Sequence, residues 1–239
     1  MPATTAAKTP LTVVPSHCGA CKLREVCLPH GLADPDLLDD LSYTRKRVHR
    51  GDTLFHAGAL FESIYAVRSG FFKSSVVLED GRDQVTGFHM AGEIVGLDGI
   101  GGGSHTADVT ALEESEVCII PYARLDEPRM QHQLHKVMSR ELVRDQGVML
   151  LLGTMRAEER VATFLINLSQ RFVARGFSAN EFHLRMTREE IGSYLGLSLE
   201  TVSRTFSHFQ ERGLVAVQQK HIRILDVKGL KAAVSQPNE

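Results

Sequence analysis

Residues 187–204 constrain the fold of this 239-residue chain more than any other segment. Thr187, followed three residues later by Glu190, forms a capping-box pattern, which begins a helix. Gly196 supplies a tight turn, and Ser198 can cap a second helix directly after it. Two short helices joined by a glycine turn predict a helix-turn-helix.

The second of these helices has an apolar and a polar side. Because a helix turns by about 100° per residue, apolar residues three or four positions apart share one side of it. Val202, Phe206 and Phe209 have this spacing, and we expect them to pack on the first helix. Glu200, Ser203 and Arg204 fall on another side, which could enter the DNA major groove. Arg204 can donate two bonds to guanine, Glu200 can accept from cytosine, and Ser203 can contact base or phosphate. The alternative is a solvated helix with an internal Glu200–Arg204 ion pair.

The C-terminal third has further features of a DNA-binding domain. Apolar runs at residues 213–217 and 222–224 predict a hairpin after the second helix, which would form a wing. Residues 156–239 carry 12 Lys and Arg against 9 Asp and Glu, although the whole chain has a net charge of −2. A basic C-terminal part on an acidic body fits a nucleic-acid-binding end. We therefore expect a winged helix-turn-helix domain over residues 157–239.

Residues 31–127 have a different pattern. Short apolar runs alternate with frequent glycines, and Asp80-Gly81 is a hairpin signal. Many short strands with glycine turns predict an antiparallel β domain. Together with the C-terminal helices, this gives an α+β fold.

A helical pattern occupies residues 128–156. Its stripe, at steps of three and four, comprises Met130, Leu134, Val137, Met138, Glu141, Leu142, Asp145, Val148, Met149 and Leu152. We expect this long helix to pair with its copy in a homodimer; packing against its own β domain is the alternative. A second helix is expected over residues 157–175 and ends before Gly176.

Four cysteines form the second functional signal. Cys18, Cys21 and Cys27 lie close together, and Cys118 follows in an apolar run. We assign residues 18–30 to a cysteine segment, after a disordered tail at 1–17 and before a short acidic helix at 34–41. Thiolates suit iron–sulfur clusters and zinc, and a thiol–disulfide switch is also possible. The spacing alone leaves all three open.

Several functional classes lack support in the sequence. It has neither an apolar run long enough to cross a membrane nor a signal-peptide pattern, so a cytoplasmic location is expected. Motifs for nucleophilic catalysis, phosphate loops and zinc-dependent hydrolysis are missing, so an enzyme is not expected.

The order of these features resembles the FNR group of the CRP superfamily, oxygen-responsive regulators of anaerobic metabolism. Besides the cysteines and the run Leu199-Glu200-Thr201-Val202-Ser203-Arg204, residues 65–70, 86–89 and 157–160 look like this group. The resemblance covers nearly the whole chain, from Cys18 to about Leu225. It implies that the β domain is a β-roll similar to cyclic-nucleotide-binding domains, followed by a dimerisation helix and the winged helix-turn-helix.

The resemblance also implies a mechanism. A 4Fe-4S cluster would bind to Cys18, Cys21, Cys27 and Cys118, and its iron would be the chain's metal. Glu200, Ser203 and Arg204 would read TTGAT-like inverted half-sites, and loss of the cluster in oxygen would weaken the dimer and release DNA. Asp145 would be a dimer switch, because two copies of its carboxylate repel each other.

The resemblance also bears on two further ligands, RNA polymerase and a cyclic nucleotide. The turn at residues 79–82 matches a surface that relatives present to RNA polymerase, although a plain hairpin tip explains it equally well. Residues 101–106 contain no arginine, whereas nucleotide-binding relatives use an Arg-Ser pair there, so no cyclic nucleotide is expected. Two rival hypotheses are a CRP-like regulator that responds to a small molecule or thiol redox state without a cluster, and a thiol-exchange protein.

Overall fold

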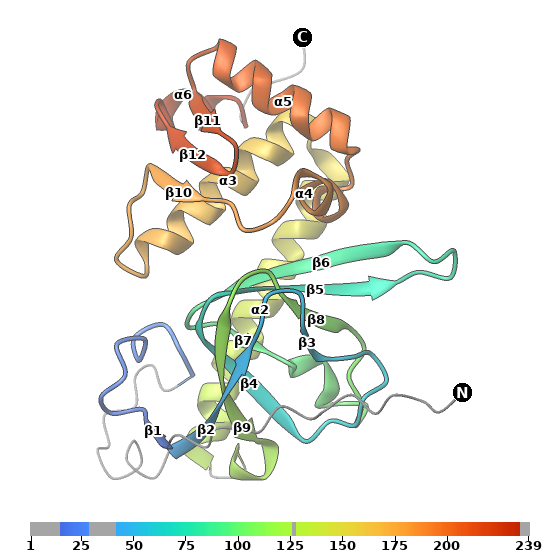
Figure 1. Cartoon of the computed structure of the whole chain (residues 1–239), viewed down its shortest axis with the longest axis vertical. Coiled ribbons are helices and arrows are strands. Elements are labelled where there is room, and N and C mark those ends of the chain that lie inside the picture. The colour runs from blue at the N-terminus through green and yellow to red at the C-terminus, as the bar shows by residue number, and fades with distance from the viewer. Residues whose placement is uncertain (1–14, 29–41, 126–127, 235–239) are drawn as a thin grey trace.

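The structure, a computed structural model, describes residues 15–28, 42–125 and 128–234. Figure 1 shows a β domain, a C-terminal domain above it, and the long helix α2 (Pro128–Thr154), which runs from one to the other. The α+β class and the predicted order of β-roll, long helix and helix-turn-helix are confirmed.

The β domain consists of two antiparallel sheets. The first has the order β1-β2-β9-β4-β7, made of β1 (Pro15–His17), β2 (Ser42–Val48), β9 (Ser115–Pro121), β4 (Ser63–Ser69) and β7 (Ile94–Val95). The second has the order β3-β8-β5-β6, made of β3 (Thr53–Phe55), β8 (Asp108–Ala111), β5 (Phe71–Val77) and β6 (Asp83–Met90). Two short 3-10 helices, η1 (Leu97–Gly99) and η2 (Tyr122–Leu125), complete this domain. Buried apolar side chains such as Ile64, Phe72 and Val117 form its interior.

The N-terminal boundary requires a correction. The sequence predicts a disordered tail over residues 1–17, but residues 15–17 form β1, which pairs antiparallel with β2. The backbone groups at an edge of β2 offer hydrogen bonds to any adjacent extended segment, and tail composition does not reveal this. The rest of the tail and the short helix expected at 34–41 lie outside the described residues.

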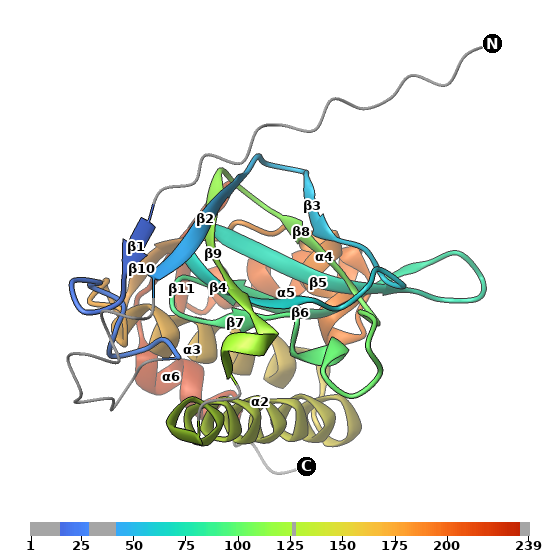
Figure 2. The same cartoon turned by 90° about the horizontal axis from the view of Figure 1, so that it is seen from below.

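Strands β5 and β6 form the hairpin expected at Asp80-Gly81. Gly81 has a φ of +82°, in the left-handed region that glycine adopts without strain. Figures 1 and 2 show the tip of this hairpin reaching beyond the other strands of the β domain. Val77 and Leu78 near the tip are exposed, so this end of the hairpin faces solvent.

The first half of helix α2 packs on its own β domain, the alternative weighed from the sequence, and its second half is more exposed. Met130, Leu134 and Val137 in its first half are buried against the β domain. In the second half, Leu142 and Met149 are 59% and 63% exposed. Figure 2 shows that α2 lies along one side of the β domain, with no other described element on its outer side. The helix ends at Thr154, two residues before the predicted boundary of 156, because Arg156 is extended and caps the next helix.

The C-terminal domain holds the predicted helix-turn-helix and wing. Its elements are α3 (Ala157–Val173), β10 (Glu181–His183), α4 (Arg188–Leu195), α5 (Leu199–Glu211), β11 (Val215–Gln218), β12 (His221–Ile224) and α6 (Val227–Ala232). Thr187 and Glu190 form the capping box of α4, and the Ser198 side chain accepts a hydrogen bond from the Thr201 backbone to cap α5. Gly196 ends α4 at a φ of +64°. Helix α3 ends at Val173, two residues earlier than predicted.

The β domain and the C-terminal domain share one core. Phe71, Val85 and Phe88 of the β domain belong to the same buried cluster as Phe164 of α3. Helix α4 also contacts β6 through polar atoms, since the Val85 backbone N–H donates to Ser193 Oγ at 2.8 Å. None of the helices in the described ranges is apolar over a length that could span a membrane.

Candidate functional site

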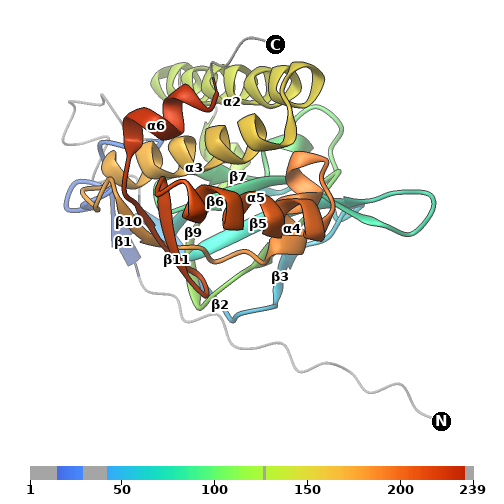
Figure 3. The same cartoon turned by 90° about the horizontal axis from the view of Figure 1, so that it is seen from above.

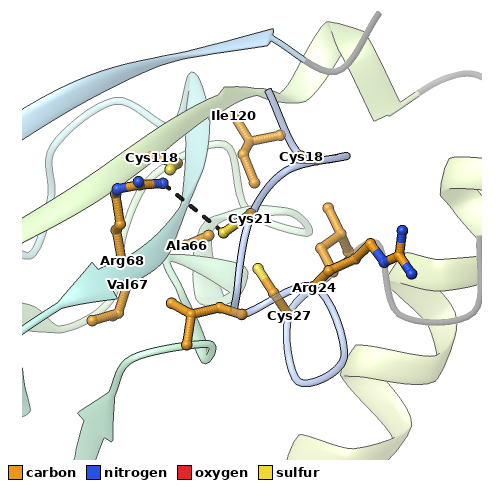
Figure 4. Close-up of a pocket in the computed structure, with 11 residues that line it drawn as sticks. Cys18, Cys21, Arg24, Cys27, Ala66, Val67, Arg68, Cys118 and Ile120 are labelled. Atoms are coloured by element: carbon orange, nitrogen blue, oxygen red, sulfur yellow. Dashed lines mark hydrogen bonds between the residues drawn. The ribbon is translucent and has the colours of Figure 1, made fainter. Parts of the chain in front are cut away.

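The four cysteines line one pocket at the edge of the β domain. Cys118 lies on β9, in register with Ala66 of the neighbouring strand β4. Cys18, Cys21 and Cys27 lie on a loop of tight turns, in which the Cys21 backbone N–H donates to the Cys18 carbonyl at 3.1 Å. Figure 4 shows this loop lying against the strand that carries Cys118. The fold therefore brings the distant fourth cysteine to the other three.

The surroundings of these thiols are largely apolar. The apolar side chains that line the pocket are Leu23, Leu28, Ala66, Val67 and Ile120. Burial raises the pKa of both Cys18 and Cys27 to about 12, and the neighbouring cysteines contribute further. Burial also raises the pKa of Cys118. Without a bound cation these thiols stay protonated at neutral pH, whereas a reactive thiol needs a lowered pKa.

Arg68 brings a positive charge to the pocket. Its Nη1 donates to Cys21 Sγ at 3.9 Å, and its Nε lies 2.9 Å from Glu116 Oε2. The guanidinium opposes the effect of burial by lowering the pKa of Cys18 and Cys118. No pattern in the sequence points to Arg68, because only the register of β4 against β9 places it beside the cysteines.

The spacing of the thiols bears on what they could hold. Among the residues that the structure describes, no three His, Cys, Asp or Glu side chains are grouped closely enough to hold one metal ion. Four cysteines nevertheless line the same pocket. In a 4Fe-4S cluster each thiolate binds a different iron, so its ligands surround an inorganic core rather than a single ion. The arrangement fits a cluster better than a compact tetrahedral zinc site.

The predicted DNA-reading side chains lie on the outer side of α5. Glu200 and Arg204 are exposed, Ser203 is half-buried, and Val202 on the opposite side is fully buried. Figure 3 shows α5 and the wing strand β11 on the upper face of the molecule. Arg204 makes no ion pair with Glu200 or with any other residue in the described part of the chain, so its guanidinium is available to a ligand. The internal ion pair weighed from the sequence is therefore not formed.

Asp145 lies in the second half of α2 and, with Met138 and Leu142, lines a cavity between this helix and the β domain. It is exposed, and Met138, Leu142 and Met149 share its side of the helix at steps of three or four residues.

A second cavity, of about 740 Å³, lies between α2 and the β domain. Asp98 stands at its rim and accepts hydrogen bonds from the backbone N–H groups of Thr106 and Ala107, at 2.6 and 3.2 Å. Adjacent backbone N–H groups of this kind often bind anions. In this chain a carboxylate of the protein itself already occupies them.

Family models match both domains. A model described as the cyclic nucleotide-binding domain matches residues 45–132, and a Crp-like helix-turn-helix domain matches residues 159–233. Among solved structures, FixK2 from Bradyrhizobium japonicum is similar, with a TM-score of 0.76 and 29% identity over 83% of this chain and all of that chain. Fold and family models thus define a DNA-binding transcription regulator, not an enzyme, whose N-terminal β domain is similar to cyclic nucleotide-binding domains.

Whole-length relatives narrow this class. The transcriptional activator FnrA of Stutzerimonas stutzeri is 49% identical over 91% of this chain and 92% of its own length. The fumarate and nitrate reduction regulatory protein of Escherichia coli K12 is 46% identical over 87% of this chain and 86% of its own. The chain belongs to the FNR/Anr family of CRP-type transcription regulators, as the resemblance predicts.

Proposed function

We propose that this protein is an oxygen-responsive transcription regulator of anaerobic metabolism. It would hold a 4Fe-4S cluster on Cys18, Cys21, Cys27 and Cys118, dimerise through α2, and bind inverted TTGAT-like half-sites. The observation that carries the proposal is the single pocket lined by all four cysteines in a chain with a helix-turn-helix domain.

The cysteine pocket suits a cluster in its chemistry. Four thiols can supply four thiolate ligands, and apolar side chains surround them in the pocket. Arg68 offsets part of the negative charge that four thiolates would gather there. When bound, such a cluster supplies a redox-active inorganic centre that oxygen can destroy.

The rival hypotheses fit these residues less well. Thiol exchange requires a thiolate, but burial raises the pKa of Cys18 and Cys27 to about 12. A regulator with incidental cysteines does not explain why three loop cysteines lie with Cys118 in one pocket.

DNA readout requires two copies of the chain. A single recognition helix contacts only half of an inverted site, so the affinity for the whole site depends on dimerisation. The exposed apolar side of α2 supports pairing with a second copy. Glu200, Ser203 and Arg204 would contact base edges in each half-site, and the exposed turn at Asp80 and Gly81 would contact RNA polymerase.

We also infer that the β domain does not bind a cyclic nucleotide. The segment 101–106 supplies no arginine for a phosphate. Asp98 engages the backbone N–H groups of Thr106 and Ala107, and its negative charge would repel a phosphate.

The proposal is tested by measuring DNA binding with and without air. Anaerobically purified protein should bind a duplex with two inverted TTGAT-like half-sites at least about tenfold more tightly than the same protein after exposure to air. Fluorescence anisotropy with this duplex, and with one of scrambled sequence, separates specific from general binding. Equal affinity before and after air would refute oxygen control, while leaving the DNA-binding assignment intact.

The Asp145→Ala substitution should strengthen the dimer in air. Bringing two carboxylates together costs about 1 kcal/mol or more near a protein surface, so its removal should tighten dimerisation by about fivefold or more. Sedimentation equilibrium of air-exposed protein measures this change. Gln146→Ala is the matched control, because Gln146 is its exposed neutral neighbour on the same helix. No gain for Asp145→Ala over this control would remove Asp145 from the switch.

A further inference from the structure

The turn between β6 and β7, which carries Gly92 and Glu93, touches the cysteine loop on one side. A Cβ added at Gly92 would lie 2.5 Å from Val26 Cγ2, so Val26 of the cysteine loop packs directly on bare backbone. The Gly92 N–H donates to the Val67 carbonyl at 2.8 Å, and the Val67 N–H donates to the Glu93 carbonyl at 2.9 Å. Val67 also lines the cysteine pocket. The turn therefore contacts the pocket twice, through Val26 of the cysteine loop and through Val67 of β4.

The Glu93 side chain points the other way, to the DNA-binding domain. Its carboxylate accepts hydrogen bonds from Arg171 Nε at 3.0 Å and Arg171 Nη2 at 2.6 Å, and from Arg175 Nη2 at 2.7 Å. Both arginines belong to α3, the first helix of the C-terminal domain. Arg144 Nη1 of α2 lies 3.7 Å from the same carboxylate. One carboxylate therefore joins the β domain, the dimerisation helix and the DNA-binding domain.

Backbone groups of the same turn add to this contact. Arg171 Nη2 donates to the Phe88 carbonyl at 2.6 Å, and Arg175 Nε donates to the Ala91 carbonyl. The Glu93 side chain is only 13% exposed, and the three arginines hold its pKa near 2, so it is charged at any physiological pH. A buried carboxylate bonded to two guanidinium forks fixes the position of α3 with little freedom.

We propose that Glu93 is a positioning residue through which the state of the cysteine pocket sets the placement of the DNA-binding domain and of α2. This inference rests on the cluster-dependent function proposed above. A change in the pocket shifts Val26 and Val67, and with them the backbone of Gly92 and Glu93. Because Arg171 and Arg175 follow the Glu93 carboxylate, α3 moves with it, and α5 moves with α3.

A second polar contact between the domains supplies a matched control. Arg185 Nε of the C-terminal domain lies 2.9 Å from Glu113 Oε2 of the β domain. Glu113 does not line the cysteine pocket. Like Glu93→Gln, the Glu113→Gln substitution removes one negative charge from an ion pair between the two domains. A role in stability alone would lower the affinity before and after air together, whereas coupling to the pocket changes the ratio of the two affinities, and only in Glu93→Gln.

The test compares the full-length wild-type protein with Glu93→Gln, Glu113→Gln and Arg171→Lys. Each is assayed for iron and sulfide, and for affinity to the inverted-site duplex before and after air. Glu93→Gln should load iron as the wild type does, yet its ratio of anaerobic to aerobic affinity should fall at least about fivefold. Glu113→Gln should keep the wild-type ratio. Hydrogen exchange in residues 157–173 should be faster in metal-free Glu93→Gln than in metal-free Glu113→Gln.

The outcomes separate this inference from the proposed function. Suppose that the wild-type protein has a large ratio of anaerobic to aerobic affinity. If Glu93→Gln keeps this ratio, or if Glu113→Gln lowers it as much as Glu93→Gln does, the inference is overturned and the proposed function stands. If the wild-type protein does not respond to air, both fail. Should Glu93→Gln not fold, Arg171→Lys decides, because lysine cannot reproduce the two parallel bonds. If Arg171→Lys then had the same ratio of anaerobic to aerobic affinity as the wild type, the inference would be overturned.

Discussion

Replacing Arg204 by alanine is expected to abolish tight binding to the inverted site. A bidentate contact between arginine and guanine contributes about 1–3 kcal/mol of discrimination, and a dimer makes two such contacts. The loss of about 2–6 kcal/mol corresponds to roughly 30-fold up to about 20,000-fold in affinity. Arg204 is exposed on α5, so its truncation leaves the buried side of the helix unchanged. Anaerobic titration of the inverted-site duplex measures the effect.

The control for this experiment is Arg212→Ala on the same helix. Arg212 caps the C-terminal end of α5 and lies 3.7 Å from Glu158, away from the three predicted base contacts. Arg212→Ala removes one positive charge from the domain, as Arg204→Ala does, so it reports the general electrostatic effect of that loss on DNA binding. Binding to scrambled DNA should weaken only slightly, and similarly, in both variants. Equal losses on specific and scrambled DNA for Arg204→Ala would mean that Arg204 contacts phosphate rather than a base.

Replacing Cys118 by serine is expected to remove the cluster and, with it, specific DNA binding under anaerobic conditions. Serine keeps the size of the side chain but offers a hard, weakly acidic hydroxyl where iron and sulfide require a soft thiolate. Cys118 is the only one of the four cysteines on a strand, so its loss would remove the one thiolate that a strand of the β domain supplies. Iron and sulfide should fall close to zero, and affinity for the inverted site should fall to that of the air-exposed wild type.

Ile119→Val provides the matched control for Cys118→Ser. Ile119 is the next residue on β9, and its side chain projects to the opposite side of the sheet. It should retain iron, sulfide and DNA binding. Melting temperatures of the metal-free proteins identify any general damage to the strand. If Cys118→Ser retained wild-type iron and sulfide, Cys118 would not be a ligand.

Local signals in the sequence predicted the DNA-binding domain well. The capping box at Thr187 and Glu190, the turn at Gly196 and the cap at Ser198 each act within a few residues, so sequence alone defines them. The apolar side of α5 follows from helical periodicity in the same way.

Features that depend on strand register or on contacts between domains were not predictable. The pairing of Ala66 with Cys118 places Arg68 beside the cysteines, and no pattern in the sequence gives that register. Glu93 meets Arg171 and Arg175 across about 80 residues of sequence, where one chain offers no signal for such a pairing. Strand β1 was missed for the same reason, because residues 15–17 form a strand by pairing with the edge of β2.

The proposed regulation depends on Cys18, Cys21, Cys27 and Cys118 together holding one 4Fe-4S cluster. The most direct test is to purify the chain without oxygen, assay iron and acid-labile sulfide, and record the visible spectrum before and after air. We expect about four iron and four sulfide per chain, and a broad visible absorption that disappears in air. Colourless protein that lacks both iron and sulfide, yet binds the inverted site fully, would contradict it.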